Sequence, residues 1–375
     1  MKKSNYSISK NTRFIAIAAF MLLVSSALFA YKKQDFTKQI KKDFDISANG
    51  EVALYNKYGK IEVKTGSSNK VSIEVNIIVK ANNENAAKES FERIRIDFSS
   101  EANYVKAQTN IADKSGWNWG SCTDDYTINY LVYMPKTCKL DLNNRYGDSY
   151  VAALDASARV DVKYGNFQMD GLSDNLMVTL GYGNGSVNNC KNLSAGISYG
   201  KLQVKEANNV AMTTKYSTVD IAKANDIAVT TKYDTYILGV GNKLANTGKY
   251  DHFDIKSINE IAVKSDYTDY KIGNIAQKGA FQISYGHLKI ANLEKDFKNI
   301  TVESKYTDVS IAVESGAGYS FFGEANYGNL KVPSEMNLTK NEARNQFSQK
   351  EGTLGSRSDK GSIHIKTSYG DCKIK

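Results

Sequence analysis

Three lysines, Lys215, Lys232 and Lys249, recur at intervals of 17 residues, and each directly precedes a tyrosine. The same position carries a basic residue in four further repeats: Lys57, Arg145, Lys163 and Lys305. Ammonium groups about 5 Å apart repel one another unless they meet an anion. The pattern therefore predicts a basic stripe, Lys215, Lys232 and Lys249, that binds an acidic ligand. The alternative is a solvated row of lysines that discourages aggregation, partly neutralised by acidic neighbours, namely Asp220, Asp234, Asp251 and Asp254.

These lysines belong to a longer repeat that is marked by tyrosine. The tyrosine recurs every 17 or 18 residues from Tyr146 to Tyr285, then at steps of 21 to Tyr306 and Tyr327, with outlying copies at Tyr58 and Tyr369. The fifth residue after it is aliphatic or Met in all thirteen copies. A fixed period with one fixed core position indicates a repeat protein whose units bury their apolar faces against one another.

Within a repeat the apolar residues alternate, as in Leu176, Val178 and Leu180, which indicates strands. Gly or a small polar residue follows each tyrosine and suits a corner with left-handed dihedrals. We therefore predict an all-β fold, a parallel β-solenoid (single-stranded β-helix) of 17–21-residue coils with an N-terminal β-rich cap. Four asparagines at one position of successive coils suit either an amide ladder or ordinary turns: Asn208, Asn225, Asn242 and Asn259.

The alternation places the tyrosines on the buried side of their strand, so we expect an aromatic stack inside or at the edge of the core. The alternative is an exposed aromatic strip that stacks on sugar rings.

The chain divides into five predicted segments. Residues 1–30 carry four basic residues before an apolar run from Phe14 to Ala30, which is typical of a secretory signal. Residues 31–139 form the β-rich cap with one short helix from Asn85 to Arg93, and residues 140–332 form the solenoid repeats. Residues 333–361 are a polar excursion, with a short helix expected at Lys340–Gln349, and residues 362–375 are a terminal coil.

Export and charge together restrict the location and the partners. Without residues 1–30 the chain keeps 45 basic and 40 acidic residues, a balance that gives no argument for nucleic acid. We expect an extracytoplasmic protein, in the periplasm, on the outer-membrane surface or secreted, with no integral membrane domain after signal removal.

Catalytic, metal and cofactor motifs are not found. The histidines His252, His287 and His364 lie at outward positions without a second ligand at metal-binding spacing. Asp269 and Asp308 share one outward position two coils apart, which would suit an inverting glycosidase, but a solvated face is the simpler interpretation.

Cysteine and tryptophan give few further signals. If a disulfide exists we expect it between Cys122 and Cys138, whereas Cys190 and Cys372 lie too many coils apart to pair. Trp117 and Trp119 share a Gly-containing loop and either bind a ligand or pack against the cap.

The Tyr-Gly-x-apolar-x-apolar unit, as at Tyr58–Val63 and Tyr327–Val332, resembles that of an exported bacterial putative-adhesin family of β-repeat proteins. The order also matches: signal, one unit, longer strands with a helical break, a strand ending in Tyr133-Met134-Pro135, then a run of units. The long run and the frequent replacement of Gly depart from shorter members. The resemblance implies the fold and carries no catalytic motif.

We therefore expect a non-enzymatic extracytoplasmic β-solenoid, an adhesin or envelope-binding scaffold whose partner is an acidic envelope polysaccharide or another cell-surface component. One alternative is a carbohydrate-active β-helix enzyme, which needs a cluster of acids on one face. Another is an ice- or crystal-binding solenoid, which needs a flat Thr-x-Thr array, but Thr213, Thr214, Thr230 and Thr231 supply it in only two coils.

Overall fold

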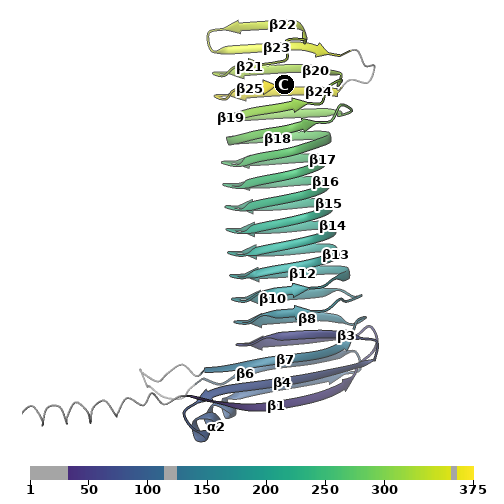
Figure 1. The fold of residues 1–375 in the computed structure, drawn as a ribbon, viewed down its shortest axis with the longest axis vertical. Helices are drawn as coiled ribbons and strands as arrows, with labels where there is room; N and C mark the ends of the chain where they lie inside the picture. The colour runs from purple at the N-terminus through teal and green to yellow at the C-terminus, as the bar shows by residue number, and fades with distance from the viewer. Residues whose placement is uncertain (1–32, 114–124, 356–360) are drawn as a thin grey trace, which may run out of the picture.

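The computed structural model describes residues 33–113, 125–355 and 361–375. The molecule is a rod of stacked coils with a broader group of strands at its N-terminal end (Figure 1). The predicted parallel β-solenoid is therefore confirmed. The signal segment, Cys122, Trp117 and Trp119 lie outside the described residues.

Long strands and one helix build the N-terminal end of the rod. β1 pairs antiparallel with β4, β4 with β7, and β5 with β6. The helix is close to its predicted position, and Asn83 caps its N-terminus by accepting a hydrogen bond from the main-chain N–H of Ala86. The elements are β1 (Gln34–Asp45), β4 (Lys70–Ala81), α2 (Glu84–Arg93), β5 (Ile94–Glu101), β6 (Tyr104–Ile111) and β7 (Asp125–Pro135).

The coils run parallel from β2 onward. Between residues 184 and 266 each coil is one strand that begins two residues after one tyrosine and ends just before the next, whereas the two strands that contain Tyr285 and Tyr306 continue through these corners. The first coils comprise β2 (Glu51–Lys57), β3 (Ile61–Gly66), β8 (Lys139–Arg145), β9 (Ser149–Val151), β10 (Ala158–Lys163), β11 (Phe167–Met169) and β12 (Leu172–Gly181). The long strands are β13 (Asn184–Ser198), β14 (Lys201–Lys215), β15 (Thr218–Lys232), β16 (Thr235–Lys249), β17 (His252–Asp266), β18 (Asp269–Leu293) and β19 (Asn299–Val313).

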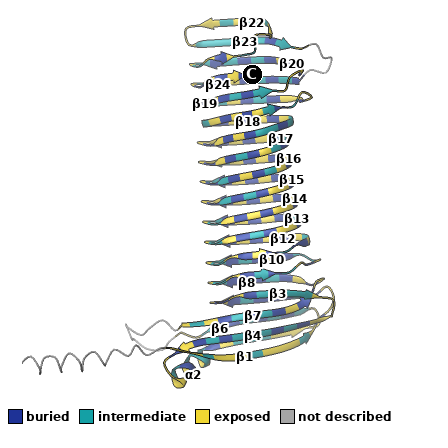
Figure 2. Cartoon of the chain, in the orientation of Figure 1, coloured by how far each residue is buried: buried dark blue, intermediate teal, exposed yellow. Residues whose placement is uncertain are grey.

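Alternating burial along each strand builds a continuous apolar core inside the rod (Figure 2). Aliphatic residues dominate it, and three aromatic rings, Tyr236, Phe253 and Tyr270, stack inside at centroid separations of 4.9 and 5.0 Å. Neighbouring coils thus bury the same positions against each other, which is the usual source of solenoid stability.

The last coil does not extend the rod. β24 and β25 lie between β19 on one side and β20 with β21 on the other, so the end of the chain inserts between two earlier coils. A hairpin of β22 and β23 follows β20 in the stack and covers the end. The short helix predicted at residues 340–349 is therefore wrong. These elements are β20 (Tyr319–Asn326), β21 (Leu330–Lys331), β22 (Asn337–Arg344), β23 (Phe347–Leu354), β24 (Gly361–Ser368) and β25 (Cys372–Ile374).

The predicted amide ladder forms in part. Asn225 donates to Asn208 over 3.1 Å and Asn259 to Asn242 over 3.0 Å, but Asn242 itself donates to Asp226 over 3.4 Å. A ladder that the sequence analysis missed lies one residue further along the chain, where Asn209 donates to Asn192 and Asn192 to Asn175, both over 2.7 Å.

Candidate functional site

All thirteen repeat tyrosines stand in one column along a corner of the rod. Their ring centroids lie 4.6–5.1 Å apart with interplanar angles of 3–17°. Tyr369 lies between Tyr306 and Tyr327, in agreement with the inserted last coil. The predicted single column is confirmed.

The predicted burial of these tyrosines is wrong, because each is 40–52% exposed. The left-handed conformation belongs to the tyrosine itself, whose φ is between +52° and +63°, and not to the residue after it. This turn takes the ring out of the strand's alternation and points it outward.

The exposed column still offers no platform for sugar rings. The faces of each inner ring are covered by the rings above and below, and an edge-on contact with Tyr126 at 5.5 Å covers the outer side of Tyr58. The column therefore presents ring edges and hydroxyl groups to a ligand, which suits hydrogen bonding and not stacking.

The basic stripe Lys215, Lys232 and Lys249 runs directly beside this column. Lys232 and Lys249 are register partners on β15 and β16, and the hydrogen bond from the N–H of Tyr216 to the carbonyl of Lys232 places Lys215 in line with them. Nζ of Lys215 and of Lys232 lie 5.2 and 5.4 Å from the ring centroids of Tyr216 and Tyr233. No carboxylate among the described residues lies within ion-pairing distance of these three ammonium groups.

The acidic neighbours are mostly engaged elsewhere. Asp254 pairs with Lys271 at 2.7 Å, and Asp266 follows Lys249 in the column at the next register position. Asp234 and Asp251 point into the rod and are only 3% and 5% exposed. The lysines of the stripe thus carry positive charge at the surface, and the carboxyls of Asp234 and Asp251 are buried beneath them.

Asp234 and Asp251 are held by a repeated set of donors at the tyrosine corner. Asp234 accepts hydrogen bonds from the main-chain N–H of Ser217 at 2.7 Å and of Lys232 at 2.9 Å, and from Thr214 Oγ1 at 2.7 Å. Asp251 accepts from the N–H of Asp234 at 2.9 Å and from Thr231 Oγ1 at 2.7 Å.

Burial dominates the protonation behaviour of both carboxyls. Desolvation raises the pKa of Asp251 to about 6, against the opposing effect of its hydrogen bonds, and it raises the pKa of Asp234 as well. Desolvation thus raises the pKa of two buried carboxyls that lie one coil apart.

Other coils close the same corner with glycine. At Gly147 an added Cβ would lie 1.9 Å from the carbonyl oxygen of Gly59 in the neighbouring coil, so no side chain fits without moving backbone. The amide of Asn144 serves this corner by donating to the carbonyls of Gly59 and Gly147, both at 3.0 Å. Glycine is required here for close backbone approach, although its φ is not positive.

A shallow groove of about 1280 Å³ follows the outer face of the strands that lead to the tyrosines. Alanines of five successive coils form its outward floor: Ala211, Ala228, Ala245, Ala262 and Ala280. Thr213, Thr230 and Thr247 line a second groove of about 840 Å³ beside it. Thr214 and Thr231 point inward, so the Thr-x-Thr array needed for ice binding does not form.

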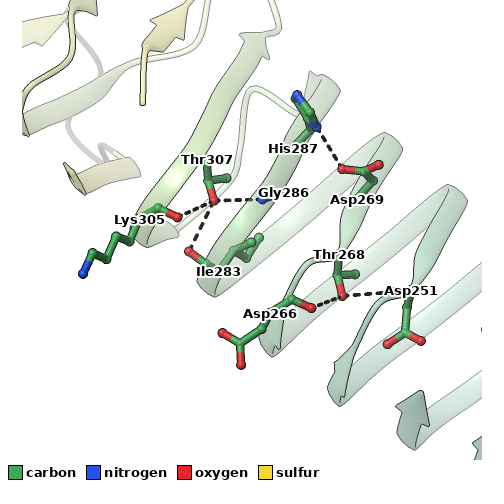
Figure 3. A network of polar contacts seen from close by, with 9 residues as sticks. All are labelled: Asp251, Asp266, Thr268, Asp269, Ile283, Gly286, His287, Lys305 and Thr307. Carbon is green, nitrogen blue, oxygen red and sulfur yellow. Dashed lines mark hydrogen bonds and ion pairs between the residues drawn. The ribbon is translucent and has the colours of Figure 1, made fainter. Parts of the chain in front are cut away.

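Histidines and aspartates share an outward column two residues after the tyrosine, and Figure 3 shows two of them, Asp269 and His287. His287 Nδ1 lies 2.9 Å from Asp269 Oδ1, a carboxylate contact that the spacing along the sequence does not indicate. Only the strand register brings these two residues together, since they are 18 positions apart in the chain.

The same column does not form a carboxylate pair for glycoside cleavage. The coil of His287 separates Asp269 from Asp308, and Asp308 accepts a 2.9 Å hydrogen bond from the N–H of Asp371. Within the described ranges no group of three His, Cys, Asp or Glu side chains is arranged to hold a metal ion.

Cys138, Cys190 and Cys372 are buried free thiols, so the predicted absence of a Cys190–Cys372 bridge is confirmed. Burial raises the pKa of Cys190 to about 11 and that of Cys372 to about 12, which makes both thiols unreactive. In the described part of the chain, no helix has the length and apolar character needed to cross a membrane.

Comparison with known proteins finds no matching family model and no matching curated protein. Among solved structures, a putative cell adhesion protein from Clostridium sporogenes matches with 11% identity over 91% of this chain and 99% of its own, at a TM-score of 0.19. A putative adhesin from Bacteroides fragilis matches with 15% identity over 68% of this chain and 95% of its own, at a TM-score of 0.28.

A putative lipid binding protein from Parabacteroides distasonis matches with 11% identity over 68% of this chain and 94% of its own, at a TM-score of 0.31. Solved structures described as adhesins are thus among those similar to this chain. The identities and TM-scores are low, so the function proposed below rests on the geometry of this chain.

Proposed function

We propose that the protein is a non-enzymatic, extracytoplasmic binding scaffold that attaches to an acidic polysaccharide of the cell envelope. The binding edge is the basic stripe Lys215, Lys232 and Lys249 together with the adjacent tyrosine hydroxyls. The observation that carries this proposal is the alignment of three lysines in successive coils, two exposed and one, Lys232, half-buried, none of them in an ion pair with a carboxylate among the described residues.

The geometry suits a polymer better than a small anion. Parallel strands repeat at about 4.8 Å, so the three cations extend along the rod in a line and match a ligand with charges along its length. Each tyrosine hydroxyl can donate one hydrogen bond to an oxygen of the ligand. Exposed charges in such a line attract an anion weakly and are screened by salt.

Enzymatic alternatives receive less support from the same geometry. The inverting mechanism needs two carboxyl groups about 6.5–9.5 Å apart with room for a water between them. Asp269 and Asp308 stand about 10 Å apart by coil counting, on a surface where His287 already occupies the intervening coil. The location outside the cytoplasm is supported by the signal-like sequence of residues 1–30.

The test compares two variants with the same change in charge. Lys215, Lys232 and Lys249 are changed together to Gln in one, and Lys205, Lys256 and Lys289, which are exposed at other positions of the coils, are changed to Gln in the other. On a column of sulfated dextran at low salt, the first variant should elute several-fold earlier than the wild type, and the second should elute close to it. Equal retention of the two variants would refute the stripe as the binding edge, and release of reducing sugar by the wild type would indicate an enzyme.

A further inference from the structure

Asp234 and Asp251 lie directly under the basic stripe, and they share its backbone. The N–H group of Lys232 donates to Asp234, and the N–H group of Lys249 donates to Asp251. Each carboxyl also binds the corner of the preceding coil, so the two form a chain of hydrogen bonds through the corners of Ser217, Asp234 and Asp251. Coils at both ends of the rod have glycine at this position and no charge beneath the tyrosines.

The other groups that face this pair cannot supply a compensating positive charge inside the rod. Tyr236 and Tyr270 are buried phenols whose pKa burial raises, so they stay neutral. Thr214, Thr231 and Asn246 are neutral and hydrogen-bonded. The charged neighbours are on the surface: the three lysines, Asp266 in the same column as the lysines, and His252, which follows Asp251 and is exposed.

We propose that Asp234 and Asp251 regulate the affinity of the basic stripe for an anionic polymer. Mild acidification protonates the buried carboxylates, and Lys215, Lys232 and Lys249 then bind the polymer more tightly. This inference rests on the proposed function and adds its control by pH. The step is a proton transfer from solvent to a carboxylate oxygen, with no other bond formed or broken.

Electrostatics gives the direction and the size of the effect. At neutral pH the ionised carboxylates beneath the stripe offset part of its positive potential; protonation removes that offset while the lysines keep their charge. The raised pKa of Asp251, about 6, places the change between pH 7.5 and pH 5. A unit charge about 10 Å away, screened by a surface dielectric, changes the affinity for an anion by about threefold to tenfold.

The experiment measures binding of dextran sulfate, whose sulfates stay ionised over this range, at pH 7.5 and pH 5 and at constant ionic strength. All proteins carry His252→Gln, which removes the imidazole next to Asp251 from the comparison. The parent should bind about threefold to tenfold more tightly at pH 5. The variant with Asp234→Asn and Asp251→Asn should bind at pH 7.5 as the parent does at pH 5, with a pH ratio near one.

A second variant covers the case in which the Asn protein does not fold. Asp234→Ser with Asp251→Ser introduces the residue type that Ser217 already has at this position of the preceding coil, and the same loss of pH dependence is expected. If either folded variant keeps the parent's pH ratio, the regulation is refuted while the stripe stands. If Lys215, Lys232 and Lys249 changed together to Gln bind as tightly as the control triple at both pH values, the proposed function and this inference both fail.

Discussion

The chain turns the corner after each repeat tyrosine with glycine in some coils, the glycine corners, and with a polar residue in others, the polar corners. Under Tyr164, Tyr182 and Tyr199 the corner residue is glycine, and the inward residue two before the tyrosine is aliphatic (Val162, Leu180 and Ile197). From Tyr216 to Tyr267 the corner residue is Ser217, Asp234, Asp251 or Thr268, and hydroxyls such as Thr214 and Thr231 face it from inside.

Both kinds of corner keep the tyrosine column unbroken, because the ring centroids lie 5.0 Å apart at the glycine corners and 4.7–4.8 Å apart at the polar corners. The tyrosine column is therefore a feature of the whole rod, whereas buried carboxylates occur in two neighbouring coils and coincide with the basic stripe. A uniform scaffold with one chemically distinct segment is what a localised binding edge requires.

The largest expected effect comes from placing a carboxylate in the core where no donor serves it. Ile255 is fully buried four residues after Asp251. Ile255→Asp should lower the free energy of unfolding by about 4 kcal/mol, since an unpaired charge is buried, and urea denaturation followed by circular dichroism measures it. Ile255→Val, which should cost about 1 kcal/mol, is the control. If Ile255→Asp lowers the free energy of unfolding only slightly, the hydrogen-bond donors around Asp251 are not needed for a carboxyl to be buried in this rod.

A side chain at a glycine corner should cost somewhat less. In Gly147→Ala the new Cβ meets the carbonyl of Gly59 and forces the two coils apart, which we expect to lower the unfolding free energy by about 3 kcal/mol. Ser217→Ala, at a corner that already holds a Cβ, should cost about 1 kcal/mol through its lost hydrogen bond to the carbonyl of Lys215. Equal losses of unfolding free energy in Gly147→Ala and Ser217→Ala would contradict the conclusion that only the glycine corner lacks room for a Cβ.

The pH dependence of stability should distinguish the polar corners from the rest of the rod. The pKa of Asp251 is raised in the folded state, so its contribution to stability is fully present below pH 3.8 and is lost as the pH rises through about 6. Relative to Asp251→Asn, the wild type should therefore gain about 2 kcal/mol between pH 7 and pH 4. Thermal unfolding of both proteins across this range checks the sign, and a gain with rising pH would contradict it.

The smallest effect concerns the tyrosine column. Tyr233→Ala removes two stacking contacts and keeps a left-handed residue with a Cβ, so we expect a loss of about 2 kcal/mol. Tyr233→Gly removes the same contacts but relieves the backbone strain, and it should cost about 1 kcal/mol less. If the Gly variant is no more stable than the Ala variant in thermal unfolding, the left-handed conformation of residue 233, with φ of +60°, does not strain the backbone.

The sequence predicts the fold because the period and the core position five residues after the tyrosine survive in every repeat. It misplaces the tyrosine rings because alternation counts residues and does not register a left-handed residue. The sequence pattern suggests that conformation for Gly147 and its equivalents, whereas the tyrosines adopt it. The contact of His287 with Asp269 depends on register between coils, and a single sequence does not reveal it. The inserted last coil is hidden for a similar reason, since similar repeats fit equally well at several places in the stack.

The central claim is that three aligned lysines form the binding edge, and the salt dependence of binding tests it most directly. Association constants for dextran sulfate are measured for the wild type, the Lys215/Lys232/Lys249→Gln variant and the Lys205/Lys256/Lys289→Gln control at several salt concentrations. Each lysine that contacts the polymer should contribute about one unit to the slope of the logarithm of the association constant against that of the salt concentration. We predict that the slope falls by about three in the stripe variant and is unchanged in the control, whereas equal slopes for the two variants would contradict the claim.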